Sequence, residues 1–149
     1  MSVPAQAISG WRDGWYVVPY QVTFRDVDFF GHVNNAVYFT FFEWGRTKYW
    51  LVLMGSTLPG AIGFIVAHAD CDFRRQLDFG QEIEICTKVG DLRNSSLDFL
   101  CEIRKSNGGE IAATGKVVVV MFDWTAQRAI PIDEPLRAKI AGFQKGGEV

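Results

Sequence analysis

The sequence is poor in residues that bind metals or form disulfides. Among its 149 residues only three are cysteines and two are histidines. Cys71, Cys86 and Cys101 never come in a Cys-x-x-Cys pair, and their odd number and wide spacing argue against a disulfide framework or a structural zinc site. We therefore expect reduced thiols, no metal and no cofactor.

The sequence also lacks an excess of charge and a long apolar run. Its 15 basic and 17 acidic residues give a formal net charge of −2 without a block of one sign, which disfavours nucleic acid as a partner. No stretch reaches the roughly 18 uninterrupted apolar residues of a membrane span. The first residues lack the basic start and apolar run of a secretory signal. We expect a cytoplasmic protein that does not bind membranes and forms one domain over residues 1–149.

What the sequence does have is a succession of strand patterns around one long helix pattern. The β-branched and aromatic residues of 16–24 predict a strand, in which Pro19 favours a sheet edge or a bulge. A loop over 25–35 leads into a helix predicted over 36–54. Four further strands and a short final helix are predicted over 62–74, 81–89, 96–105, 110–124 and 134–143.

Alternation within these strands indicates an antiparallel sheet with one buried face. In the strand over 96–105, every second residue is apolar and predicted to point inward: Leu97, Phe99, Cys101 and Ile103. The turn residues of 106–109 then predict a hairpin. Only the helix over 36–54 is long enough to cover such a sheet. The sequence therefore predicts an α+β hot-dog fold, a curved antiparallel sheet wrapped around one long central helix.

That helix is apolar on nearly every side, and aromatic residues make up 14% of the chain. A helix of this kind is enclosed by other structure instead of lying on a surface. A single sheet over one helix also leaves surfaces that need partners, so we expect a homodimer or homotetramer.

Several familiar site motifs fail when their spacing is checked. The segment from Asp26 begins like a calcium loop, but Phe30 and Val37 occupy two of the ligand positions. Gly115 lacks the partner glycine of a phosphate loop, and the sequence has no Gly-x-Ser-x-Gly elbow. His68 has apolar neighbours in a predicted strand, and we expect it in the core.

The remaining chemistry is a carboxylate close to a helix start. Asp28 lies seven residues before Asn35, where the helix begins. Unpaired N–H groups at the positive end of a helix attract negative charge that develops on a carbonyl oxygen. A carboxylate across that carbonyl can act as a base toward water or attack directly, and the adjacent Phe29 and Phe30 are expected to desolvate it. These groups suffice to hydrolyse an acyl thioester without a metal. Helix capping by the Asp and Asn residues of this loop is the alternative interpretation.

This loop and helix resemble the 4-hydroxybenzoyl-CoA thioesterase-like family of hot-dog acyl-CoA thioesterases, through Phe24-Arg-Asp-Val-Asp28-x-x-Gly31-His-Val-Asn-Asn-x-x-Tyr38, Phe42-Glu43 and Arg46. The resemblance implies that Asp28 is the catalytic carboxylate and that the backbone N–H near Asn35 polarises the thioester carbonyl. The loop is also similar to that of plant acyl-ACP thioesterases, in which an Asp, an Asn and a His are implicated. Asp28 and His32 match that set, whereas Phe30 replaces its Asn. We expect His32 either to orient Asp28 or a water, or to make a hydrogen bond at the helix entry.

The substrate is expected to bind between the helix and a neighbouring subunit. An apolar tunnel for the acyl group would be lined by Phe29, Phe30, Tyr38 and Phe42. Members of the resembled family bind the CoA nucleotide with basic residues at the subunit interface, and the counterparts here are Arg74, Arg75, Arg93 and Ser95. The aromatic content fits an aromatic acyl group and a medium fatty chain equally well.

The sequence therefore predicts an acyl-CoA thioesterase with Asp28 as base or nucleophile. Two alternatives stay open. A non-catalytic acyl-CoA sensor or regulatory subunit would keep the pocket without needing the carboxylate. A hot-dog enoyl-CoA hydratase uses an Asp and a His, but its usual Asp-x-Asn-Pro-x-His loop is absent here because Phe30 and Gly31 replace the Asn and the Pro.

Overall fold

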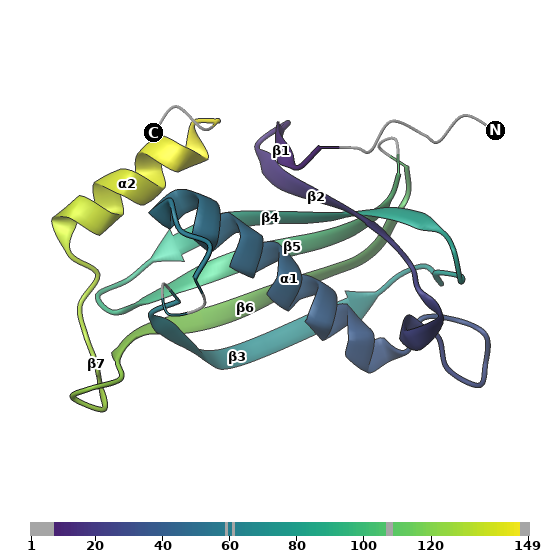
Figure 1. Ribbon diagram of the computed structural model, residues 1–149, viewed down its shortest axis with the longest axis horizontal. Coiled ribbons are helices and arrows are strands. Elements are labelled where there is room, and N and C mark those ends of the chain that lie inside the picture. The colour runs from purple at the N-terminus through teal and green to yellow at the C-terminus, as the bar shows by residue number, and fades with distance from the viewer. Residues whose placement is uncertain (1–7, 59, 61, 107–108, 147–149) are drawn as a thin grey trace.

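The chain folds into a curved antiparallel sheet with one long helix packed against a single face, as the computed structural model shows (Figure 1). The structure describes residues 8–58, 60, 62–106 and 109–146. The strands lie in the order β1-β2-β4-β5-β6-β3, with β7 paired to β6. The element bounds are β1 Gly10–Arg12, β2 Trp15–Gln21, η1 Phe24–Asp26, α1 Asn35–Met54, β3 Phe64–Phe73, β4 Glu82–Leu92, β5 Ser96–Lys105, β6 Ile111–Asp123, β7 Arg128–Ala129 and α2 Glu134–Gln144.

Helix α1 begins and ends where local chemistry dictates. Asn34 is its N-cap, and Gly55 closes it in the left-handed conformation with a φ of 63°, which glycine adopts without steric cost. Its buried residues recur at helical spacing and face the sheet: Tyr38, Phe41, Phe42, Gly45, Arg46, Tyr49, Trp50 and Leu53. The prediction of one long helix with these limits is confirmed to within one residue.

The opposite side of α1 is not enclosed within one subunit. Phe39, Trp44 and Val52 are between 37% and 51% exposed, so the expectation of a helix surrounded on all sides is wrong for the single chain. The sheet can cover only one side of a helix, and the apolar character of the other side needs a different explanation. A contact with a second copy would supply one.

The central strands carry the core. Leu97, Phe99, Cys101 and Ile103 of β5 are all buried, as the alternation predicts. Val117 and Val119 of β6 are also buried, and β6 pairs with β5 on one side and β3 on the other. The apolar run of β6 is therefore that of a central strand.

The first long strand is shorter than predicted. β2 ends at Gln21, and the chain then turns into the short helix η1. Pro19 pairs with Glu84 of β4 on one side, whereas β1 pairs only with residues 15–17 on the other. Pro19 thus lies where β2 is an edge, in agreement with the missing N–H of proline.

His68 does not lie in the core, contrary to the sequence-based expectation. It belongs to β3, the outer strand of the sheet beside β6, and its side chain is 56% exposed. A register shift between Val66 and His68 interrupts the alternation at this point, and the imidazole Nε2 lies 3.0 Å from the Asp70 carboxylate. Apolar neighbours in sequence do not imply burial on an edge strand with a bulge.

The remaining elements complete the domain. β5 and β6 are antiparallel neighbours, while residues 107–108 of the predicted hairpin turn lie outside the described residues. Helix α2 is capped by Asp133 and buries Ile140 and Phe143. No helix in the described part of the chain combines the length and apolar character needed to cross a membrane. The architecture is the α+β hot-dog fold that the sequence predicts.

Candidate functional site

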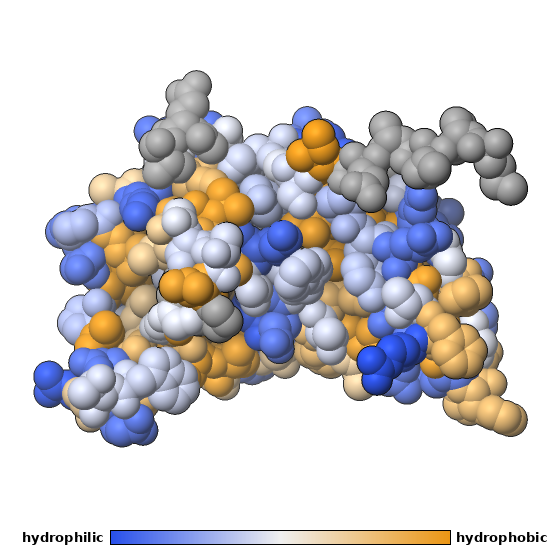
Figure 2. All heavy atoms as spheres, viewed as in Figure 1, coloured by the Kyte–Doolittle hydropathy of each residue, from blue (hydrophilic) through white to orange (hydrophobic). Residues whose placement is uncertain are grey.

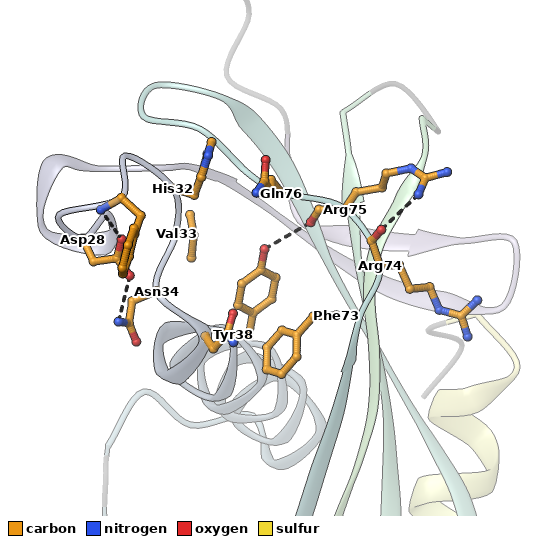
Figure 3. Close-up of a pocket in the computed structure, with 11 residues that line it drawn as sticks. Asp28, His32, Val33, Asn34, Tyr38, Phe73, Arg74, Arg75 and Gln76 are labelled. Carbon is orange, nitrogen blue, oxygen red and sulfur yellow. Dashed lines mark hydrogen bonds between the residues drawn. The ribbon is translucent and has the colours of Figure 1, made fainter.

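A pocket opens at the N-terminal end of α1, where the loop before the helix meets the end of β3 (Figure 3). Its volume is about 420 Å³. Its lining residues come from the loop, the first turn of the helix and the segment that leaves β3: Asp28, Phe30, His32, Val33, Asn34, Asn35, Tyr38, Phe73, Arg74, Arg75 and Gln76. Three segments that are distant in sequence thus converge on one cavity.

The loop is held in shape by a tight turn. The Asp28 N–H donates to His32 O at 3.0 Å, and the Gly31 N–H donates to Asp28 O at 2.9 Å. Gly31 has a φ of +85°, a conformation that an L side chain rarely adopts. Val33 then anchors the loop, because its side chain is buried and its N–H donates to Leu77 O at 2.9 Å.

The Asp28 carboxylate accepts one hydrogen bond on each oxygen. Phe30 N–H donates to Oδ1 at 2.9 Å, and the Asn34 side-chain amide donates to Oδ2 at 3.0 Å. The cap of α1 is Asn34 and not Asp28. Since a carboxylate oxygen can accept more than one hydrogen bond, Asp28 retains acceptor capacity beside the pocket.

The first turn of α1 leaves one donor free at the same pocket. The Ala36 N–H donates to Asn34 Oδ1 and the Val37 N–H donates to Asn34 O, both at 2.9 Å. The N–H of Asn35 makes no hydrogen bond within the described residues, and Asn35 lines the pocket. An unpaired donor at the positive end of a 20-residue helix favours a partly negative oxygen.

Aromatic rings from the helix and β3 bound the pocket. Tyr38 and Phe73 meet edge to face with ring centroids 5.2 Å apart. The Tyr38 hydroxyl donates to Arg75 O at 3.4 Å, and burial raises the pKa of Tyr38 to about 12. The phenol therefore stays protonated near neutral pH.

His32 does not contact Asp28 through its ring. Its Nδ1 lies 2.9 Å from Asp78 Oδ1, and only its backbone carbonyl bonds to Asp28. Of the roles expected for His32, a direct contact of the imidazole with Asp28 is therefore not formed, although both residues line the same pocket. Asp78 is 46 residues further along the chain and gives no signal in the sequence of the loop.

Of the four aromatic residues predicted to line an acyl tunnel, two lie at the pocket and two lie elsewhere. Tyr38 and Phe30 line the pocket. Phe29 does not line it and is fully exposed, and Figure 2 shows apolar side chains projecting at the end of the molecule where this loop lies. Phe42 is completely buried in the core, against Gly115 of β6. Phe29 and Phe30 are both exposed. Contrary to the expectation, they therefore do not desolvate Asp28 within a single subunit.

The residues predicted to bind the CoA nucleotide also lie in two different places. Arg74 and Arg75 line the pocket, and Arg75 Nε donates to Glu110 Oε2 at 2.9 Å. Arg93 and Ser95 lie between β4 and β5, where the Ser95 carbonyl accepts from Met121 of β6.

The turn between β4 and β5 is remote from the pocket of its own subunit. Phe73 pairs with Ala113, eight residues before Met121, which corresponds to about 26 Å along a strand. Arg93 is bound to Asp98 and Ser96. A nucleotide contact by Arg93 or Ser95 would therefore have to be made from another subunit.

Four pocket residues are not among the site residues that the sequence predicts: Val33, Asn34, Phe73 and Gln76. Val33 contributes as the buried anchor of the loop. Asn34 carried a signal, because two adjacent asparagines provide more polar groups than one cap requires. Phe73 and Gln76 lie at the end of β3 and beyond it, and only the fold brings them to the loop. No local motif marks either residue.

Comparisons with known proteins agree with this fold. Residues 22–140 match the model of the thioesterase-like superfamily. The chain is 32% identical over 109 residues to the uncharacterised protein YsmA of Bacillus subtilis. The matched region covers 73% of this chain and 74% of YsmA.

Among solved structures, a thioesterase of Thermus thermophilus complexed with coenzyme A and zinc is 30% identical, with a TM-score of 0.79 over 90% of this chain and 98% of that one. A predicted thioesterase from Bacillus stearothermophilus is 24% identical, with a TM-score of 0.78 over 85% and 94% of the two chains. This second likeness supports the fold alone.

Proposed function

Because this chain belongs to the thioesterase-like superfamily, we propose that it hydrolyses an acyl-CoA thioester to a free acid and coenzyme A. Membership supports thioester hydrolysis as the reaction class. One observation carries the finer proposal: the Asp28 carboxylate and the unpaired Asn35 N–H line one pocket. A thioester bound between them would meet a base on one side and a hydrogen-bond donor on the other.

The donor acts on the carbonyl oxygen. As a nucleophile adds to the carbonyl carbon, negative charge develops on that oxygen, and the Asn35 N–H with the helix dipole stabilises it. Loss of one such donor typically costs about 10²–10³ in rate. Asn35 thus contributes through its backbone.

The carboxylate supplies the nucleophile by one of two routes. As a general base, Asp28 takes a proton from water while the water oxygen bonds to the carbonyl carbon. The C–S bond then breaks, and the thiolate leaves and takes up a proton. As a nucleophile, the Asp28 carboxylate oxygen bonds to the carbonyl carbon while the C–S bond breaks, and the thiolate leaves and takes up a proton. Water then hydrolyses the resulting anhydride to the free acid and the regenerated Asp28 carboxylate. General-base assistance is worth about 10²–10⁴. His32, held by Asp78, is an auxiliary group that could orient the water.

The rim of the pocket and one solved structure support coenzyme A esters as the proposed substrate class. Arg74 and Arg75 border the pocket, and their side chains extend away from Asp28 (Figure 3). Arg75 is bound to Glu110, so Arg74 would offer the positive charge for the phosphates of a CoA nucleotide. Phe30, Tyr38 and Phe73 offer apolar surface for the acyl group. The thioesterase from Thermus thermophilus was solved with coenzyme A, which makes a CoA ester the first substrate to test. We further propose a cytoplasmic homodimer or homotetramer.

The experiment is thiol release from a panel of aliphatic and aromatic acyl-CoAs. The proposal predicts thiol release from at least one ester well above the rate in buffer. Consumption of an enoyl-CoA without thiol release would favour the hydratase. Tight binding of acyl-CoA with no reaction of any kind would favour the sensor, and either outcome would overturn the proposed activity.

A further inference from the structure

The side chain of Asn34 joins Asp28 to the first turn of α1 (Figure 3). Its Oδ1 accepts from the Ala36 N–H at 2.9 Å, and its Nδ2 donates to Asp28 Oδ2 at 3.0 Å. The orientation of the amide is fixed by chemistry, because a backbone N–H cannot accept and a carboxylate oxygen cannot donate. A reversed amide would lose both hydrogen bonds.

The backbone of Asn34 is held as firmly as its side chain. Its N–H donates to Asp26 O and its carbonyl accepts from the Val37 N–H, both at 2.9 Å. The N–H proposed to bind the thioester oxygen belongs to the planar peptide unit between Asn34 and Asn35. The position of the donor and the position of the carboxylate therefore both depend on Asn34.

We infer that Asn34 is a positioning residue that sets the separation between the Asp28 carboxylate and the Asn35 N–H across the pocket. This inference rests on the proposed function. Without the Asn34 amide, the Phe30 N–H is the only hydrogen-bond donor from the described residues that holds the Asp28 side chain, and the carboxylate is free to turn. A misplacement of about 1 Å in a catalytic group costs about 10²-fold in rate.

The residue type at this position agrees with a role beyond capping. Serine, threonine and aspartate also cap helices well. A hydroxyl is shorter than the amide and has a single proton, and aspartate has no donor at all. Among these four capping residues, only asparagine accepts from the helix with one atom and donates to a carboxylate with another.

The test separates capping from positioning. Asn34→Ser and Asn34→Asp both keep a good helix cap, so we expect each Tm to stay within about 3 °C of the wild-type value. We expect kcat on the best acyl-CoA to fall at least about tenfold in both, with KM changed less than about threefold. The kcat of Asn34→Asp should fall further than that of Asn34→Ser, because the substitution places a second carboxylate beside Asp28. The matched control Asn94→Ser changes an exposed asparagine between β4 and β5 and should leave kcat unchanged.

The outcomes distinguish this inference from the function on which it rests. Wild-type kcat in either variant would overturn the positioning role. The positioning role would also be overturned if, in both variants, the loss of activity were fully explained by an equal loss of folded protein. Asp28→Asn is measured in the same series. If Asp28→Asn is fully active, the proposed function fails; if it is inactive while Asn34→Ser is fully active, only the role of Asn34 fails.

Discussion

At the scale of single residues, two glycines set how closely α1 lies on the sheet. A Cβ at Gly45 would clash with Thr87 Oγ1 and would lie 2.8 Å from the Ile85 side chain. A Cβ at Gly115 would clash with the Asp70 carbonyl oxygen and lie 2.5 Å from the Phe42 ring. Any larger residue at either position pushes the helix and the strands apart, and the pocket lies at the end of this same interface.

We therefore predict that Gly45→Ala destabilises the protein although alanine favours helices. Higher helix propensity contributes about 1 kcal/mol, whereas overpacking typically costs about 1–3 kcal/mol. Gly115→Ala should lower the free energy of unfolding further than Gly45→Ala does, because its Cβ meets backbone that cannot rotate away. Chemical denaturation measures the free energy of unfolding. Gly10→Ala is the control, because the described residues other than its chain neighbours place no heavy atom within 4 Å of its Cβ position. A Gly45→Ala protein at least as stable as the wild type would contradict the close packing.

Residues of the site were predictable from sequence only where local chemistry places them. Asp28, Asn35 and Tyr38 reach the pocket because the loop and the first turn of α1 place all three. Phe42 lies one helical turn beyond Tyr38, and by that point the helix already packs against β6. The partner of His32 comes from the segment after β3, and no pattern in the loop indicates it.

At the scale of secondary structure, the predictions succeed where end signals are strong. Asn34 and Gly55 bound α1, and regular alternation bounds β5 at the predicted residues. The two-residue strand β7 and the three-residue strand β1 are too short to leave a pattern in sequence. The bulge in β3 arises from pairing with β6, and a single strand's sequence does not encode it.

At the scale of the whole molecule, the fold exposes a sheet edge and an apolar side of α1. β3 is the outer strand of the described sheet beside β6 and most of its ten residues are exposed. The outer side of α1 adds Phe39, Trp44 and Val52 as exposed apolar groups. A long exposed edge strand with apolar surface nearby is a template for pairing with another chain.

We therefore predict a particle of two or four chains of 16.7 kDa, measured by light scattering after size-exclusion chromatography. Val66→Lys adds a charge to the exposed edge of β3 and should shift the population toward smaller particles, since edge lysines oppose strand pairing. Thr125→Lys adds the same charge in the turn after β6 and should have no effect. A single-chain mass for the wild type at micromolar concentration would contradict the prediction.

The central claim is that the Asp28 carboxylate performs the chemistry at the start of α1. Its most direct test is kcat/KM of Asp28→Asn on the best acyl-CoA, beside Asp91→Asn, which removes the same charge from an exposed position near the end of β4. The account predicts a loss of at least about a hundredfold for Asp28→Asn, with wild-type activity for Asp91→Asn and unchanged Tm for both. Full activity of a folded Asp28→Asn protein would contradict it.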